Sequence, residues 1–411
     1  MENVFETLKK RGFIQQCTNA DEIARLLSGE KITYYVGFDP TADSFHVGSL
    51  VPIMAMVHLQ RAGHTPIAII GGGTTMIGDP SGKTTMRQMI SRETIESNGM
   101  KILSQLRRYL NFSDTSGKFL NNAEWLLPLS YVEFLRDIGR HFRVNEMIRA
   151  EAYRQRLERE EGLSFIEFNY QLLQAYDFLH LFRQHNCVLQ LGGDDQWGNI
   201  LAGVDLVRRV EGKTVHAVTF PLFTTASGEK MGKTAGGAVW LDANRTSPYE
   251  FYQHWVNIND RDVQRFLACF TLLPMDEIVR LGKLKSESVR EAKEVLAYEV
   301  TKLAHGETEA EKARNASRAA FGDEGADMSA IPTTTIDVDR LVGGILIVDL
   351  FCEVGLGSSK SAVRRLIQQG GAYLNGEQVK ETDTIVTEEH LDAGTLILRH
   401  GKKQFHRVSI G

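Results

Sequence analysis

The alternation of strand-like and helix-like segments after Lys31 is the feature that most limits how this chain can fold. Residues 32–38 and 66–70 are rich in β-branched, aromatic and aliphatic side chains, and a helix-like stretch separates them. Strands that alternate with helices form parallel α/β sheets. Polar or glycine-rich segments, residues 39–48 and 71–79, directly follow both strand-like runs. Because ligands bind at the carboxyl ends of the strands in such sheets, we predict a Rossmann-like fold with a nucleotide crevice there.

Two short glycine-containing signatures, far apart in the chain, indicate what that crevice binds. In the first, His46 can donate a hydrogen bond to a phosphate oxygen, Gly48 lets the backbone lie close to a nucleotide, and Thr41 adds a hydroxyl. In the second, Lys230 and Lys233 sit on a glycine-containing segment that can close over a triphosphate. Taken alone, the histidine can be a capping or core residue and the lysine segment a solvated turn. Their joint occurrence favours ATP binding.

Composition places the chain among ordinary soluble proteins with two or three domains, since 24% of its 411 residues are charged and 42% are hydrophobic. No apolar run approaches the roughly 20 residues that span a bilayer, and the N-terminus lacks a secretory pattern, so we expect a cytoplasmic protein. The net charge of −5 gives no overall attraction to nucleic acid. The scattered cysteines suggest neither disulfides nor a metal site. Ile77 and Ser227 stand where a P-loop NTPase needs glycine, which excludes that class.

The second half of the chain changes character. A helical region is predicted to begin at Ser247, with Pro248 in its first turn and Glu250 at the capping-box position. Residues 260–321 are rich in helix formers, and a polar stretch follows them. We therefore expect a Rossmann-like catalytic domain at residues 1–245, an all-α domain at 246–325, a linker at 326–344 and a small α+β RNA-binding domain at 345–411.

The C-terminal segment combines a predicted capped helix at residues 356–367 with a predicted strand at residues 372–379. This segment resembles a small RNA-binding fold first recognised in a ribosomal small-subunit protein. The basic side chains expected to contact RNA are Lys360, Arg364, Arg365, Lys402 and Lys403. Basic and acidic residues balance from Phe351 onward, so a neutral domain for contacts between subunits is the alternative.

A predicted helix between the two signatures has a polar face. Tyr170, Gln174 and Asp177 are spaced at i, i+4 and i+7, so their side chains project from one side of that helix. The flanking sequence is apolar and aromatic, which favours a pocket lining over a solvent-exposed stripe. A strand-like run then leads into residues 192–199, where adjacent glycines permit close approach of a ligand and Asp195 can accept from ribose hydroxyls.

Together these motifs resemble the bacterial tyrosyl-tRNA synthetases, which are class I aminoacyl-tRNA synthetases. The resemblance covers the whole chain and is carried by residues 35–44, 78–83, 134–137 and 192–199 and by both signatures. It implies that the chain activates L-tyrosine with ATP and Mg²⁺, without a protein-ligated metal, and transfers tyrosine from the adenylate to the 3′ end of tRNA(Tyr). It also implies a homodimer, with residues 134–142 as a contact segment.

The resemblance assigns roles to the matching residues. Tyr35 and Asp177 would hold the phenol of tyrosine, whereas Asp79, Tyr170 and Gln174 would hold its ammonium group. The tyrosine-binding set is Tyr35, Asp79, Tyr170, Gln174, Asp177 and Gln196. The ATP-binding set is Asp39, Gly48, Ser49, Gly193, Asp195 and Lys233. The catalytic set, which meets the phosphates, is Thr41, His46, Lys83, Arg87, Lys230, Lys233 and Thr234. The signature segments are Pro40, Thr41, Ala42, Asp43, Ser44, Phe45, His46, Val47, Gly48 and Ser49, and Lys230, Met231, Gly232, Lys233 and Thr234.

The chain departs from the family pattern at two notable positions. Ser49 replaces a second histidine or an asparagine, and Asp194 replaces a common serine, where it would add negative charge near the nucleotide. We expect retuned ATP affinity and retained activity. The alternatives are a synthetase for another aromatic amino acid such as tryptophan, a noncatalytic RNA-binding protein, and an adenylyl-transfer enzyme that acts on a small metabolite without tRNA.

Overall fold

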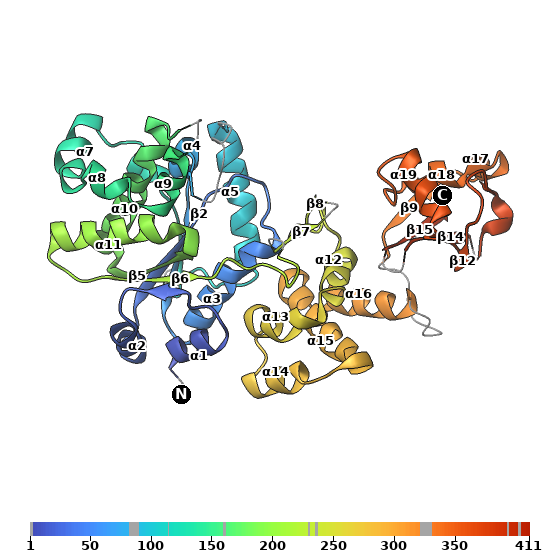
Figure 1. The fold of residues 1–411 in the computed structure, drawn as a ribbon, viewed down its shortest axis with the longest axis horizontal. Helices are drawn as coiled ribbons and strands as arrows, with labels where there is room; N and C mark the ends of the chain where they lie inside the picture. The colour runs from blue at the N-terminus through green and yellow to red at the C-terminus, as the bar shows by residue number, and fades with distance from the viewer. Residues whose placement is uncertain are drawn as a thin grey trace. The chain divides into compact units, whose positions relative to one another are not determined.

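The computed structural model describes residues 3–81, 90–113, 115–158, 162–228, 231–234, 237–320, 331–392, 394–401 and 404–411, with the backbone alone for residues 152, 233, 234 and 320. The chain divides into two compact units. Figure 1 shows the ribbon coloured by residue number, from blue at the N-terminus to red at the C-terminus. The first unit comprises Met1–Asp242 and Asn259–Leu284. The second comprises Ala243–Ile258 and Lys285–Gly411.

A six-stranded sheet forms the centre of the first unit. Its strands are β1 (Gln16–Cys17), β2 (Thr33–Phe38), β3 (Thr65–Ile70), β4 (Lys118–Asn121), β5 (Cys187–Gly193) and β6 (His216–Phe220). Their order is β1-β6-β5-β2-β3-β4, and all neighbouring pairs except β1 with β6 are parallel. The strand order therefore reverses between β2 and β5, where ligands bind in open parallel sheets. The predicted Rossmann-like fold is confirmed.

Helices cover both faces of this sheet (Figure 1), with α10 (Phe165–His185) and α11 (Trp197–Glu211) on one face and α3 (Leu50–Arg61) on the other. The period-2 alternation of β2 explains how both faces are filled. The hydroxyl of Tyr34 donates to the carbonyl of Met56 in α3 at 2.6 Å. The ring of Tyr35 turns the other way and packs against Phe178 of α10, with 5.3 Å between ring centroids.

Shorter elements complete the first unit. The remaining α-helices are α1 (Val4–Lys10), α2 (Ala20–Ser28), α4 (Thr74–Ile77), α5 (Arg92–Leu106), α6 (Ala123–Leu126), α7 (Tyr131–Asp137), α8 (Val144–Met147), α9 (Glu151–Leu157), α13 (Val263–Phe270) and α14 (Met275–Gly282). The 3-10 helices are η1 (Val47–Ser49), η2 (Gly139–His141), η3 (Asp194–Gln196) and η4 (Asp260–Asp262), and a two-stranded ribbon pairs β7 (Lys233–Thr234) with β8 (Gly237–Ala238).

Residues 259–284, which we expected in the all-α domain, belong to the first unit instead. The buried guanidinium of Arg11 holds them there by donating to the carbonyls of Ala268 and Thr271, each at 2.9 Å, at the end of α13. The last carbonyls of a helix have no donor within the helix, and the helix dipole favours a cation beside them. Composition indicated helices here correctly, but this long-range contact decides where they pack.

The second unit begins with α12 (Pro248–Val256), which starts as predicted. The Ser247 hydroxyl accepts from the Glu250 N–H at 3.2 Å, and the Glu250 carboxylate accepts from the Ser247 N–H at 2.9 Å. The other elements are η5 (Ser286–Ser288), α15 (Val289–His305), α16 (Glu307–Ala320), β9 (Thr333–Ile336), α17 (Val338–Val342), β10 (Ile345–Leu346), α18 (Ile347–Glu353), α19 (Lys360–Gln368), β11 (Ala372–Leu374), β12 (Glu377–Gln378), β13 (Ile385–Val386), η6 (Glu388–His390), β14 (Thr395–His400) and β15 (Gln404–Ile410).

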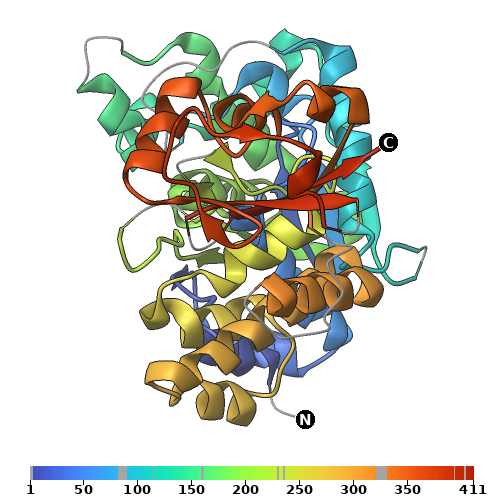
Figure 2. The same ribbon diagram turned by 90° about the vertical axis from the view of Figure 1, so that its right-hand side faces the viewer.

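The C-terminal part has its own sheet and core. Five strands run in the order β12-β11-β14-β15-β9, and the orange-red helices lie along one side of these red strands in Figure 2. Phe351 of α18 and Val363 of α19 are buried in one apolar cluster with Leu398 and Val408 of the sheet. The predicted α+β character of this segment is confirmed.

Two predictions about this region were wrong in detail. Residues 333–336, expected within the linker, form β9 and pair in parallel with β15, because threonine and isoleucine suit a strand once a partner edge exists. Residues 372–379, expected as one strand, form a hairpin of β11 and β12. Asn375 and Gly376 turn the chain with φ of 47° and 84°, the pattern of an Asn-Gly turn.

Candidate active site

One pocket lies at the carboxyl ends of β2 and β5, where the strand order reverses. It is lined by all six predicted tyrosine-binding residues, Tyr35, Asp79, Tyr170, Gln174, Asp177 and Gln196. Three residues predicted for ATP, Asp39, Ser49 and Gly193, line it as well. Of the residues predicted for ATP binding or catalysis whose side chains the structure describes, Thr41, His46, Gly48 and Asp195 are not part of this lining.

Helix α10 carries three of these side chains because it is fixed at both ends. Ser164 and Glu167 form a reciprocal capping box at its start, and Asn186 ends it in the left-handed conformation. The predicted spacing of Tyr170, Gln174 and Asp177 on one helix face is confirmed by their common place in the pocket lining.

Asp177 lines the pocket and is almost fully buried, at 4% exposure. The indole Nε1 of Trp125 donates to its Oδ1 at 2.7 Å, and Asn122 Nδ2 donates to its Oδ2 at 3.0 Å. Burial raises the pKa of Asp177 to about 7, although both hydrogen bonds lower it. The hydroxyl of Tyr35 is also buried and has no hydrogen-bond partner within the described residues. Asp177 and Tyr35 therefore offer two partners to a ligand hydroxyl.

Sequence reasoning missed Asn122 and Trp125. Both follow β4, whose carboxyl end meets the same edge of the sheet as β2 and β3. The indole of Trp125 stacks on His180 of α10 with 4.4 Å between ring centroids and an interplanar angle of 12°, which fixes its plane. The sequence signal that could have indicated them is the polar residues that directly follow β4. That strand is short and was not predicted.

Two further carboxylates, those of Asp39 and Asp79, line the same pocket. Asp39 Oδ1 accepts from the Thr74 hydroxyl at 3.0 Å, and its Oδ2 accepts from the Tyr170 hydroxyl at 3.1 Å. Asp79 Oδ2 accepts from Gln196 Nε2 at 2.7 Å. Burial, together with the charge of Asp39, raises the pKa of Tyr170, so its hydroxyl stays protonated and donates. Two carboxylates held in this way attract a cationic group.

Two amide oxygens in the same pocket await donors. Gln174 Oε1 and Gln190 Oε1 are buried and accept no hydrogen bond from the part of the chain that the structure describes. Gln190 was not predicted, because in the sequence it is one polar residue inside an apolar strand. Gly71 makes room for this arrangement, since a Cβ there would clash with Asp39 Oδ1 and Thr74 Oγ1.

The two signatures meet beside this pocket. A Cβ at Gly48 would lie 2.7 Å from Cε1 of His46 and 3.1 Å from the carbonyl oxygen of Met231. Gly232 has a φ of 83° and accepts from the Val239 N–H at 3.0 Å, and the Val47 N–H donates to the Val239 carbonyl at 3.0 Å. Residues far apart in the sequence are therefore in backbone contact.

The geometry of His46 suits a donor role. Its Nδ1 accepts from the Gly48 N–H at 3.0 Å, which leaves the proton of a neutral ring on Nε2. His46 and Thr41 are both exposed, on either side of the buried pair Ser44 and Phe45.

Some predicted residues fall outside what the structure describes. Lys83, Arg87, Lys230, Lys402 and Lys403 lie outside the described residues, and only the backbone of Lys233 and Thr234 is described. In the C-terminal part, Arg364 and Arg365 of α19 are exposed, whereas Lys360 Nζ pairs with Asp349 at 2.8 Å.

Asp194, which we expected to add negative charge near the nucleotide, is held by hydrogen bonds to the edge of the sheet. Its Oδ1 accepts from Gln16 Nε2 at 2.7 Å and from the Thr219 hydroxyl at 2.8 Å. Gln16 and Thr219 belong to β1 and β6, so Asp194 points toward that edge of the sheet and is not in the pocket lining. Asp195 instead lies against Gly193, where a Cβ would be 2.5 Å from its Oδ1.

The described residues show neither a metal-binding cluster nor a membrane-spanning helix. Among the described residues, no group of three or more His, Cys, Asp or Glu side chains could hold a metal ion. Likewise, none of the helices that the structure describes has the length and apolar character required to cross a membrane.

Comparison with known proteins decides the family. A family model described as tRNA synthetases class I (W and Y) matches residues 27–322, and the Tyrosine--tRNA ligase SYY-like C-terminal domain matches residues 326–408. A Tyrosine--tRNA ligase of Clostridium tetani is 54% identical over 408 residues, which are 99% of each chain. The chain belongs to the tyrosine–tRNA ligase family.

Other tyrosine–tRNA ligases agree with this membership. One from Caldanaerobacter subterraneus is 53% identical over 408 residues, or 99% of each chain. The structure of a C-terminally truncated mitochondrial tyrosyl-tRNA synthetase from Aspergillus nidulans aligns with a TM-score of 0.71 and 31% identity, covering 78% of this chain and 95% of that one. The predicted activity, ligation of tyrosine to tRNA(Tyr), is confirmed, and the tryptophan, noncatalytic and tRNA-independent alternatives are set aside.

Proposed function

We propose that the pocket binds L-tyrosine with its phenol at Asp177 and Tyr35 and its ammonium group at Asp39 and Asp79. Two contrasting groups of polar side chains in the pocket are the observation that carries this assignment. The first group is the Asp177 carboxylate and the buried Tyr35 hydroxyl, which has no hydrogen-bond partner among the described residues. The second group is the carboxylates of Asp39 and Asp79 and the Gln174 carbonyl. Asp39, predicted from the sequence for ATP, is assigned here to the ammonium group because it accepts a hydrogen bond from Tyr170, which was predicted for that group.

The first reaction step needs positioning and charge stabilisation. A carboxylate oxygen of tyrosine attacks the α-phosphorus of ATP, a P–O bond forms, and the bond to the leaving pyrophosphate breaks with its electron pair. No covalent enzyme nucleophile is required, so the protein contributes alignment and donors for the growing charge. His46 Nε2–H and the Thr41 hydroxyl are our assigned donors to the phosphates, with Lys83, Arg87, Lys230 and Lys233 as the assigned cations.

Magnesium would accompany the ATP phosphates and neutralise part of their charge. The acidic side chains of the pocket suit an amino group better than a metal ion, since Asp39 and Asp79 already accept from Tyr170, Thr74 and Gln196.

In the second step a ribose hydroxyl of the terminal adenosine of tRNA attacks the carbonyl carbon of the adenylate and releases AMP. We assign tRNA contacts to the exposed Arg364 and Arg365 and to Lys360, Lys402 and Lys403.

Amino-acid-dependent exchange of pyrophosphate into ATP tests the pocket assignment. Tyrosine, phenylalanine and tryptophan are compared side by side with the purified protein. We expect exchange with tyrosine alone. Comparable exchange with phenylalanine would refute the assignment of Asp177 and Tyr35 to the phenol.

We also propose that the chain forms a homodimer through the segment around α7. Tyr131 is 61% exposed and Val132 is 73% exposed, whereas Phe134, inside the predicted contact segment, packs against the core of its own chain. Neighbouring exposed apolar side chains mark interaction surfaces. Sedimentation equilibrium should show a dimer that Val132→Asp dissociates and Val342→Asp, at another exposed valine, does not. A monomeric wild-type protein at micromolar concentration would contradict this proposal. A cytoplasmic location stays a prediction.

A further inference from the structure

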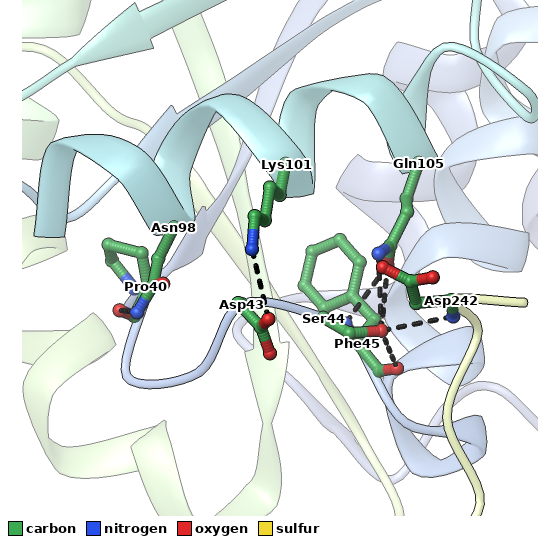
Figure 3. Close-up of polar contacts among 8 residues, drawn as sticks. All are labelled: Pro40, Asp43, Ser44, Phe45, Asn98, Lys101, Gln105 and Asp242. Atoms are coloured by element: carbon green, nitrogen blue, oxygen red, sulfur yellow. Dashed lines mark hydrogen bonds and ion pairs between the residues drawn. The ribbon is translucent and has the colours of Figure 1, made fainter. Parts of the chain in front are cut away.

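Polar side chains of α5 reach the loop that leads into the first signature (Figure 3). Asn98 Nδ2 donates to the carbonyl of Pro40 at 3.0 Å, and Lys101 Nζ lies 3.1 Å from Oδ2 of Asp43. The next contact comes from Gln105. The spacing i, i+3 and i+7 places all three side chains along one side of the helix. The helix therefore runs beside the loop and contacts it at successive points.

Gln105 uses both atoms of its amide. Its Oε1 accepts from the Phe45 N–H at 2.9 Å, and its Nε2 donates to the Ser44 hydroxyl at 3.1 Å. The Ser44 hydroxyl donates to the Phe45 carbonyl at 2.8 Å and accepts from the Asp242 N–H at 3.1 Å. Ser44 and Phe45 are buried, so loss of these partners leaves polar groups unsatisfied.

The segment after the second signature joins at the same point. Asp242 is bonded to Ser44, and the Leu241 N–H donates to the Phe45 carbonyl at 2.8 Å. Three residues before Asp242, the Val239 N–H donates to the carbonyl of Gly232. Gln105 thus supports the place where the first signature meets the segment that follows the second (Figure 3).

We propose that Asn98, Lys101 and Gln105 are positioning residues for the ATP-binding signature. Thr41 lies between the loop points that Asn98 and Lys101 contact, and His46 directly follows the residue that Gln105 holds. The inference rests on the proposed phosphate-binding roles of Thr41 and His46. Within the described residues, no side chain of α5 lines the tyrosine pocket. Loss of these contacts should therefore impair the use of ATP and spare tyrosine binding.

Gln105→Met tests this selectivity, because methionine keeps the length of the side chain and removes both hydrogen bonds. Gln60→Met is a matched control. Gln60 also uses both amide atoms to hold a loop, accepting from the Asn111 N–H at 3.0 Å and donating to the carbonyls of Asn111 at 2.7 Å and Ser116 at 2.9 Å. That loop is distant in sequence from both signatures.

Tyrosine-dependent pyrophosphate exchange gives kcat and KM for ATP, and calorimetry gives the tyrosine dissociation constant. For Gln105→Met we expect kcat/KM for ATP to fall on the order of 10-fold, as for a misplaced catalytic group, with tyrosine binding changed less than about 2-fold. Gln105→Glu, which keeps the acceptor for Phe45, should recover most of the loss. Equal effects of Gln105→Met and Gln60→Met, or no recovery with glutamate, would overturn the proposal.

If Gln105→Met does not fold, Ser44→Ala tests the same junction by removing one hydroxyl. We expect the same selective loss for ATP, and unchanged ATP kinetics would overturn the proposal. Absence of exchange in the wild-type protein would instead refute the proposed roles of the signature itself, so the two failures are distinguishable.

Discussion

The indole of Trp125 contacts two residues of α10: its N–H donates to Asp177 at 2.7 Å, and its ring stacks on His180. Asp177 and His180 are one helical turn apart on α10, so a single ring contacts both. The stack fixes the plane of the indole, so its N–H is directed at the carboxylate that we assign to the phenol of tyrosine.

Trp125→Phe should weaken tyrosine binding about 10-fold or more, since a hydrogen bond to a charged group contributes about 1.5–3 kcal/mol. Phenylalanine retains an aromatic ring for His180 and loses only the donor. Isothermal titration calorimetry with tyrosine measures the change, and the KM for ATP serves as the internal control. An unchanged tyrosine dissociation constant would show that the indole is merely packing.

Tyr35→Phe should lower the discrimination between tyrosine and phenylalanine about 10-fold, the effect of losing about one hydrogen bond. Because the Tyr35 hydroxyl has no partner among the described residues, its removal should not lower the free energy of unfolding. Tyr34→Phe is the matched control: that hydroxyl bonds the Met56 carbonyl on the opposite face of the sheet. The control should cost stability and leave discrimination intact. The ratio of kcat/KM values for the two amino acids decides between these outcomes.

The ionisation of Asp177 predicts a pH dependence of stability in the ligand-free protein. Its pKa is raised from 3.8 to about 7, so the folded state binds more protons than the unfolded state between these values. The contribution of Asp177 to stability is therefore greatest below about pH 4 and declines as the pH rises through 7, by at most about 1.4 kcal/mol per pH unit. Denaturant unfolding of wild type and Asp177→Asn at several pH values measures it. A difference between the two proteins that does not vary with pH would contradict the prediction.

Ser49→His should lower the KM for ATP about 3-fold or more, consistent with one added hydrogen bond of about 0.5–1.5 kcal/mol. Ser49 lines the pocket and makes no side-chain capping bond to α3, so its replacement removes no such contact. The KM for tyrosine should stay constant. An unchanged KM for ATP would mean that the departure from the family pattern at this position is neutral.

Short sequence patterns predicted the features that depend on contacts between residues close together in the chain. The capping box of Ser247 and Glu250 appears where its spacing indicated, and the polar face of α10 lines a pocket. The direction of Asp194 could not be predicted in this way. It depends on Gln16, which reaches it only because β1 pairs with β6 at the edge of the sheet.

The same limit explains the unpredicted partners of Asp177. Asn122 and Trp125 are separated from Asp177 by 55 and 52 residues in the sequence, and they follow a strand of only 4 residues. Such a strand has little pattern of its own and forms because β3 provides an edge. Contacts of this kind are set by the order of strands, which no short motif contains.

The close approach of Gly48 and Gly232 has a consequence for how these sequences vary. A Cβ at position 232 would lie 2.8 Å from Cγ2 of Val47, and one at position 48 would meet Met231. A mutational library that randomises either segment while the other stays fixed will recover few functional clones. Functional variants at this junction require compensating changes in both segments at once, so laboratory evolution should advance there by linked pairs of substitutions.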